Sequence, residues 1–230
     1  MTDIAIATAD AAQAAPPRSA APGLGGLLLA CAILSVVLLV SHPGGGAPAG
    51  IGEVLKREAA GQGIDALVHG GEIAVQAALL VGLAVLAARL GASRAVVIAG
   101  LTLSAIGFAA LAASLLVDGL VVPAIAARYV SAPATAQAEA RPLLVLAGAL
   151  IRFLMPMGLA FQSTAAVAWG LALWRSGPRA AGAVAGAIGA ATLTALAATI
   201  ADLDGLVAMA GLAGQTLWVA LLGGSLMRRP

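Results

Sequence analysis

The chain has one cysteine, two histidines and none of the short motifs that mark the common enzyme classes. Because Cys31 stands alone, a disulfide, a CxxC redox motif or a cysteine metal cage cannot form within one chain. The sequence also lacks a GxxxxGK(S/T) phosphate loop, an HExxH zinc-protease motif and a GxSxG nucleophile turn. We therefore expect a protein that is not an enzyme.

Charged residues are also scarce, at 10% of the 230 residues against 61% hydrophobic. The few basic residues are dispersed and form no patch that could follow phosphates, which excludes a nucleic-acid partner. A water-soluble domain could not hide this much apolar surface, so the lipid bilayer must be the solvent of the chain. Arginine outnumbers lysine eleven to one in a chain rich in alanine and glycine, a bias typical of bacteria with GC-rich DNA.

What the sequence does contain is a series of long apolar blocks. A helix rises about 1.5 Å per residue, so roughly 20 apolar residues cross a hydrocarbon core of about 30 Å. The blocks show no alternation of apolar and polar residues, which excludes membrane-barrel strands. We predict an all-α fold, a polytopic membrane helical bundle with six transmembrane helices at residues 23–40, 66–90, 95–117, 150–174, 180–201 and 206–227.

The remaining segments form a tail and two long connections. Residues 1–22 are predicted to be a disordered Ala/Pro-rich cytoplasmic tail before a transmembrane domain at 23–230. The outer loops are predicted at 41–65 and 118–149. Apolar residues at 51, 54 and 55 indicate a short interfacial helix in the first loop. Apolar stretches in the second loop extend the third and fourth helices outward or lie in the interface.

Lysine and arginine favour cytoplasmic loops. Seven arginines and two aspartates fall on one side of the predicted membrane, and the other eight acidic residues fall on the opposite side. We therefore predict that both termini are cytoplasmic and that the protein lies in the bacterial plasma (inner) membrane. The alternative is a signal peptide made of Arg18 and the first apolar run, with cleavage near Ala47-Pro48-Ala49.

The depth of each polar residue follows from counting along its helix from the inner arginines. Five charged residues lie roughly 25–36 Å from those arginines, at the outer boundary of the hydrocarbon core. They are Glu72, Asp118, Arg152, Asp202 and Asp204. Either they mark helix ends and meet water, or they converge as the mouth of an outward-facing pocket suited to a cation, a proton or a small polar solute.

A second polar layer is predicted deeper in the bundle. Four residues each lie 13 positions from an inner arginine: Gln76, Gln162, Thr192 and Gln215. This spacing places all four about 20 Å from that end. An amide that faced lipid would lack hydrogen-bond partners, so these side chains should face the interior. There they either bond helices together or line a polar vestibule below the mouth.

The two histidines, His42 and His69, are both predicted on the outer side, where they could meet. With Glu72 they could bind a metal ion or clamp a haem, because imidazole suits zinc, copper and iron. However, a histidine before Pro-Gly or at a helix start is more often a turn or interface residue. We therefore predict no cofactor, with haem or copper as the alternative.

Three short segments carry a resemblance: His42-Pro43, Val68-His69-Gly70-Gly71, and Val117-Asp118-Gly119 with the following Leu-Val-Val-Pro123-Ala. Their combination resembles a group of small, uncharacterised bacterial multi-pass membrane proteins. The likeness covers roughly residues 35–130. It implies a similar helical bundle with His69 and Asp118 on its outer face, and it brings no activity with it.

Three functional hypotheses follow. The first is a small solute- or ion-handling unit that binds through His69, Glu72, Gln76, Asp118, Arg152, Gln162, Asp202 and Gln215. The second is an accessory or structural subunit of a larger membrane complex, whose partners are the lipid bilayer and either other membrane subunits or further copies of the chain. The third is a haem- or metal-binding membrane redox protein that uses His42 and His69.

Overall fold

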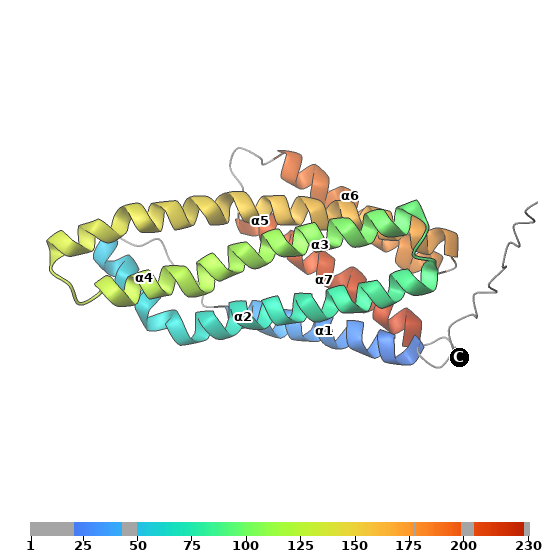
Figure 1. Ribbon diagram of the computed structural model, residues 1–230, viewed down its shortest axis with the longest axis horizontal. Coiled ribbons are helices and arrows are strands. Elements are labelled where there is room, and N and C mark those ends of the chain that lie inside the picture. Colours follow the sequence, from blue (N-terminus) through green and yellow to red (C-terminus); the bar gives the residue numbers. More distant parts are fainter. Residues whose placement is uncertain (1–20, 43–49, 177, 199–204, 228–230) are drawn as a thin grey trace, which may run out of the picture.

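The computed structural model describes residues 21–42, 50–176, 178–198 and 205–227, which fold almost entirely into helices (Figure 1). No strand occurs within these ranges, so the predicted all-α class is confirmed. The predicted disordered tail lies almost wholly outside the described residues.

Helices follow one another along the described chain with short turns between most of them. They are α1 (Ala21–Ser41), α2 (Ile51–Leu90), α3 (Ala95–Leu116), α4 (Val122–Tyr129), α5 (Ala134–Ser176), α6 (Arg179–Ala198) and α7 (Gly205–Met227), and a π-helical turn, η2 (Val117–Val121), joins α3 to α4. Because η2 runs directly into α4, residues 95–129 form one rod. Counting this rod as one, six helices among the described residues are long and apolar enough to cross a membrane. The protein is a multi-pass helical bundle.

Three of the rods are much longer than the hydrocarbon core of a bilayer is thick. α2 has 40 residues, α5 has 43 and the rod at 95–129 has 35, so they are about 50–65 Å long against a core of about 30 Å. Figure 1 shows α2 and α5, together with α4, reaching well past the ends of α1, α6 and α7. The connections predicted as outer loops are therefore largely helical at residues 51–65, 122–129 and 134–149. We call these three segments the projecting arm.

A small core of its own holds the projecting arm together. Leu55 of α2, Ala126 of α4 and Ala140 of α5 are fully buried in one cluster. Hydropathy marks where a helix enters lipid and not where the helix ends. The charged residues of the projecting arm lower its hydropathy, so the sequence analysis ended the predicted spans before the helices themselves end. The outward extension of the third and fourth spans, one of the two alternatives for residues 118–149, is the arrangement that the structure has.

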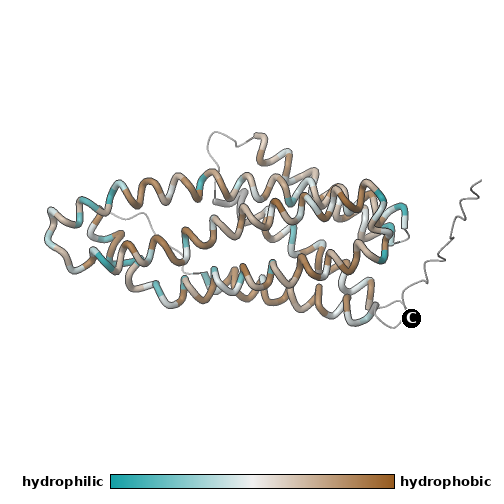
Figure 2. The backbone as a smooth tube through the Cα atoms, in the orientation of Figure 1, coloured by the Kyte–Doolittle hydropathy of each residue, from teal (hydrophilic) through white to brown (hydrophobic). Residues whose placement is uncertain are grey.

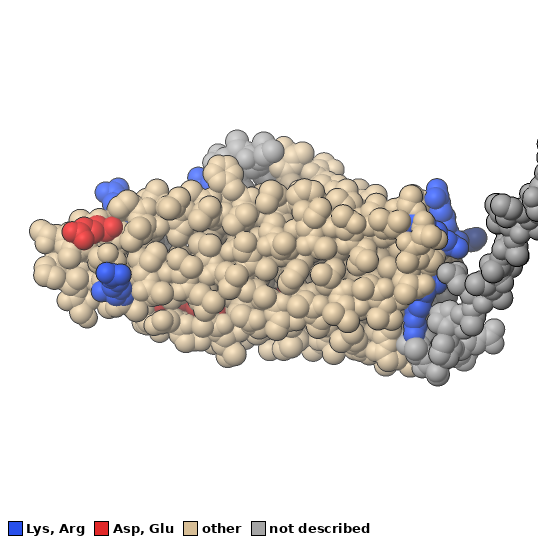
Figure 3. Space-filling view, viewed as in Figure 1, with Lys and Arg blue, Asp and Glu red and all other residues tan. Residues whose placement is uncertain are grey.

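Charge is concentrated at the two ends of the bundle. Arg89, Arg94, Arg175 and Arg179 lie at the turns of one end, which we call the arginine end. Figure 3 shows basic side chains there, basic and acidic ones toward the opposite end, and a broad uncharged belt between them on the face in view. Figure 2 shows that the same belt is predominantly hydrophobic. This distribution matches what a bilayer requires of a spanning bundle.

Glycines of α5 and α6 make a close contact between helix backbones. A Cβ added to Gly182 would lie 2.7 Å from both the Gly170 oxygen and the Trp174 nitrogen. A Cβ on Gly170 would be equally close to the Gly182 oxygen and the Gly186 nitrogen. Because glycine has no side chain, the backbones of α5 and α6 touch here, as in other small-residue interfaces of membrane helices. A Cβ on Gly186 itself would meet nothing within 4 Å.

The two glycines of the Gly182-xxx-Gly186 motif should therefore respond differently to substitution. We expect Gly182→Ala to destabilise the fold by about 1–3 kcal/mol, because the added methyl group forces the helices apart. Gly186→Ala, the matched control, should leave stability unchanged. The measurement is the temperature at which half of the detergent-solubilised protein loses its monodisperse size-exclusion peak. Equal temperatures for the two variants would contradict the helix contact.

Candidate functional site

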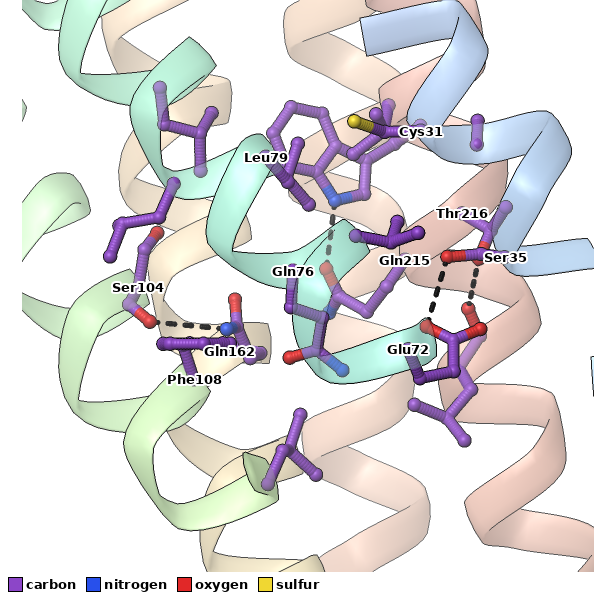
Figure 4. A pocket seen from close by; sticks show the side chains of 18 of the residues that line it. Cys31, Ser35, Glu72, Gln76, Leu79, Ser104, Phe108, Gln162, Gln215 and Thr216 are labelled. Atoms are coloured by element: carbon purple, nitrogen blue, oxygen red, sulfur yellow. Dashed lines mark hydrogen bonds between the residues drawn. The ribbon is translucent and has the colours of Figure 1, made fainter. Parts of the chain in front are cut away.

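A cavity of about 110 Å³, with a mainly apolar wall that also carries polar side chains, lies between α1, α2, α3, α5 and α7 (Figure 4). Leucines and Phe108 make up much of its wall. The wall also carries the thiol of Cys31 and the polar side chains of Ser35, Glu72, Gln76, Ser104, Gln162, Gln215 and Thr216. Glu72 is the one charged residue among them. So many polar groups at this depth need partners, because lipid offers none.

The cavity brings together half of the residues that the sequence analysis assigned to a pocket: Glu72, Gln76, Gln162 and Gln215. The glutamines come from three separate helices, α2, α5 and α7. Counting from the arginine end assigned them one depth, since straight helices that start at one membrane surface rise equally per residue. Thr192, the fourth member of that layer, is buried on α6 but does not line the cavity. Depth alone does not determine which way a side chain points.

Hydrogen bonds between α3 and α5 fix one wall of the cavity. The Gln162 side-chain amide donates to the backbone oxygen of Ser104 at 3.1 Å. The Ser104 hydroxyl in turn accepts a 3.1 Å hydrogen bond from the indole Nε1 of Trp169, which is fully buried. Ser104 therefore supports both a cavity-lining amide and the largest side chain of the core.

A similar arrangement holds Gln215 on α7. Its side-chain oxygen accepts a 2.8 Å hydrogen bond from Trp218 Nε1, and its side-chain nitrogen lies 3.5 Å from the Ser163 hydroxyl on α5. Both predicted roles of the glutamine layer thus coincide in Gln162 and Gln215. Each bonds to its neighbours and each also lines the cavity.

Glu72 and Gln76 occupy the α2 wall, one helical turn apart. The Ser35 hydroxyl of α1 donates to Glu72 Oε2 at 3.1 Å, and the carboxylate is only half-buried. No described residue forms a hydrogen bond with the Gln76 side-chain amide, which projects into the cavity in Figure 4. Glu72 and Gln76 therefore present polar atoms to whatever occupies the space.

A second cluster of polar side chains is centred on His69, which lies one helical turn from Glu72 on α2, on the side away from the arginine end. His69 Nε2 is 3.2 Å from Asp118 Oδ2, and His69 Nδ1 is 2.8 Å from the backbone oxygen of Asp65. The His42 ring, at the end of α1, meets the His69 ring edge to face at 5.0 Å between centroids. We call His42, Asp65, His69 and Asp118 the histidine–aspartate cluster.

The π-helical turn η2 explains how Asp118 reaches His69. Proline has no N–H, so Pro123 cannot donate to the oxygen of Gly119 four residues earlier. The chain instead forms a wider turn, in which the Val122 N–H donates to the oxygen of Val117. Any Cβ on Gly119 would collide with the His69 ring. Glycine at 119 and proline at 123 were the sequence signals for this turn, which hydropathy does not detect.

The remaining pocket predictions have mixed outcomes. Arg152 is exposed and does not line the cavity, so it does not join Glu72 and Asp118 in one mouth. Helical periodicity places it on the outer face of α5, which counting depth could not show. Asp202 and Asp204 lie outside the described residues. Glu72 is turned toward Ser35 and is not part of the histidine–aspartate cluster, although the sequence grouped it with the two histidines.

The contributors that the sequence analysis missed include Asp65, Ser35 and Trp218. Asp65 was treated as part of an outer loop, although its spacing of four from His69 puts both on one face of a helix. Ser35 and Trp218 carry no sequence signal, because a single serine or tryptophan in an apolar run is ordinary.

No protein-family model matches the chain, and neither a curated protein nor a solved structure matches it. The six apolar helices agree with a multi-pass membrane protein. The likeness of residues 35–130 to a bacterial group remains a prediction.

The cavity wall depends on Ser104, and this can be tested by removing its hydroxyl. We expect Ser104→Ala to destabilise the protein by about 1–3 kcal/mol, because the buried indole N–H of Trp169 loses its acceptor. Thr194→Ala is the control, since the exposed Thr194 hydroxyl bonds only to its own helix at Ala190. Size-exclusion survival after heating is again the measurement. Equal stability of the two variants would show that the hydrogen bond from Trp169 to Ser104 does not stabilise the protein.

Proposed function

We propose that the protein is a small solute- or ion-handling unit of the membrane, and that its cavity accepts a small cation or polar solute. The support is one observation: a carboxylate and three amides, carried by three helices, face one space inside an apolar bundle. Polar groups at such depth are costly and usually functional. Hydrogen bonding between helices accounts for Gln162 and Gln215 and for one oxygen of Glu72, which accepts from Ser35, but it does not account for the Gln76 side chain in the cavity wall.

The size of the cavity limits its occupant. One water molecule needs about 10–15 Å³ of such space, so about 110 Å³ accommodates several waters or one small solute. Glu72 is the one acidic residue of the lining and no basic residue accompanies it, so the space becomes negative when Glu72 is ionised. We therefore favour cations and neutral hydrogen-bonding solutes over anions.

We further propose that the arginine end faces the cytoplasm of a bacterium and that the projecting arm faces outward. The four arginines of that end support this orientation through the known preference of basic residues for the cytoplasmic side. In this orientation Glu72 lies on the outward side of the glutamine layer, and solutes enter from outside the cell.

Cys31 provides a direct test of a hydrated cavity, because it is the one cysteine of the chain and lines this space. We expect cationic aminoethyl methanethiosulfonate to modify it faster than anionic sulfonatoethyl methanethiosulfonate, after each rate is normalised to that of a free thiol. An ionised Glu72 should produce a preference of at least about tenfold, because at an effective dielectric near 20 the Coulomb energies of the two reagents differ by about 1.7 kcal/mol even at a separation of about 20 Å. Glu72→Gln should abolish the preference.

Glu139→Gln is the control variant, since Glu139 is exposed on the projecting arm. It should retain the wild-type preference. No reaction with either reagent in the folded protein would indicate a dry interior, as expected of an accessory subunit, and would overturn the proposed function.

The orientation has an independent test in intact bacterial cells. In a Cys31→Ser background, we expect Ser131→Cys, in the exposed turn of the projecting arm, to react with a membrane-impermeant maleimide. Ser93→Cys, in the exposed turn between α2 and α3, should react only after the cells are lysed. The reverse pattern would place the arginine end outside.

A further inference from the structure

The histidine–aspartate cluster has the composition and spacing of a metal site. One potential ligand atom from each of His42, Asp65 and His69 lies within 4.8 Å of the others. Asp118 lies outside this set of mutually close atoms, but its Oδ2 is 3.2 Å from His69 Nε2, so a movement of its side chain toward the set would add a fourth ligand atom. Two ligands bound to one ion at about 2.0–2.2 Å lie roughly 2.8–3.5 Å apart, depending on the coordination angle. The separation of His69 and Asp118 falls in this range.

The hydrogen bonding of His69 points the same way. Both ring nitrogens face oxygen atoms, since Nδ1 is 2.8 Å from the Asp65 carbonyl and Nε2 is 3.2 Å from the Asp118 carboxylate. A neutral imidazole has one N–H, so one nitrogen would direct a lone pair at an acceptor. A cation between Nε2 and the carboxylate removes this conflict. An N–H donated from Nδ1 to a backbone carbonyl is the usual support of a metal-bound histidine.

Asp65 supplies a second, independent observation. The residue is only 7% exposed, yet no hydrogen bond links its carboxylate to a described residue. Gly61, one turn earlier, leaves the space for this carboxylate, since a Cβ there would lie 2.8 Å from Asp65 Oδ2. Neither Asp65 oxygen is among the fully buried side-chain atoms that lack a hydrogen-bond partner. Buried charges are normally paired or bound to metal, and this carboxylate is close enough to the two histidines to serve as a ligand.

We propose that His42, Asp65 and His69 bind one divalent first-row transition-metal ion, with Zn²⁺ as the representative, and that Asp118 moves toward the ion to become the fourth ligand. Two imidazole nitrogens and two carboxylate oxygens are ligands that suit such ions. The site joins the end of α1, the middle of α2 and the π-helical turn. It lies outside the cavity and does not depend on what the cavity accepts.

Two other guests weighed from the sequence fit less well. Copper(I) prefers thiolate and thioether sulfur, and Cys31 lies in the cavity wall instead of in the cluster. A haem iron held by two histidines has one on each face of the macrocycle. His42 and His69 touch edge to face at 5.0 Å, which leaves no room for a porphyrin between them.

The test uses the full-length protein without a polyhistidine tag, purified in detergent and stripped with EDTA. Zn²⁺ is titrated in competition with a chromophoric chelator, and Co²⁺ is titrated as a visible-light probe of coordination. We expect one ion per chain for each metal. Zn²⁺ should also raise the temperature at which the protein loses its size-exclusion peak, because it binds only the folded chain.

His42→Gln and Asp65→Asn are the informative variants, because His42 is exposed and the asparagine is isosteric with aspartate. Each should weaken Zn²⁺ binding by about tenfold or more, the scale seen when metal-site residues are removed. Glu139→Gln, on the projecting arm, should bind as the wild type does. Binding of less than one ion per chain, or unchanged affinity in both variants, would overturn the proposal and leave a protonated His69–Asp118 pair.

Discussion

The requirement that every polar group inside the hydrocarbon core find a partner within the protein determines most of this structure. Backbone groups meet it through continuous helices. The side chains of Gln162, Gln215 and Trp169 meet it through hydrogen bonds between α3, α5 and α7. Gln162, Gln215 and Ser104 also line the cavity, so the bonds that satisfy these polar groups also fix the position of its walls.

Small residues make the second contribution. Backbone contact between Gly170 and Gly182 lets α6 lie directly against α5. On the opposite side, a Cβ on Gly25 would lie 2.7 Å from the Gly223 oxygen, so α1 and α7 approach equally closely. The bundle is thus compressed along two seams, while the larger polar side chains of α2, α5 and α7 keep its middle open. Close packing and an internal cavity coexist because they use different helix faces.

The sequence was sufficient to predict the six apolar helices, because these depend only on hydropathy and length. The rise per residue further predicted a depth for each polar residue. Gln76, Gln162 and Gln215 were assigned to one level on that basis, and they line one cavity. The direction of a side chain depends on helix rotation, which is why the exposure of Arg152 and the turning of Glu72 toward Ser35 escaped prediction. The π-helical turn was missed because its cause, Pro123 acting on Gly119, is local geometry and not hydropathy.

The unbroken course of α2 has a mechanical consequence. One rod carries Leu55 in the core of the projecting arm, Asp65 and His69 in the cluster, and Glu72 and Gln76 in the cavity wall. A rotation of this rod about its axis would turn all of these groups through the same angle. A partner that bound the projecting arm and turned α2 would therefore move Asp65 and His69 together with the cavity-lining Glu72 and Gln76. The helix is continuous from Ile51 to Leu90, so no hinge within it would absorb the movement.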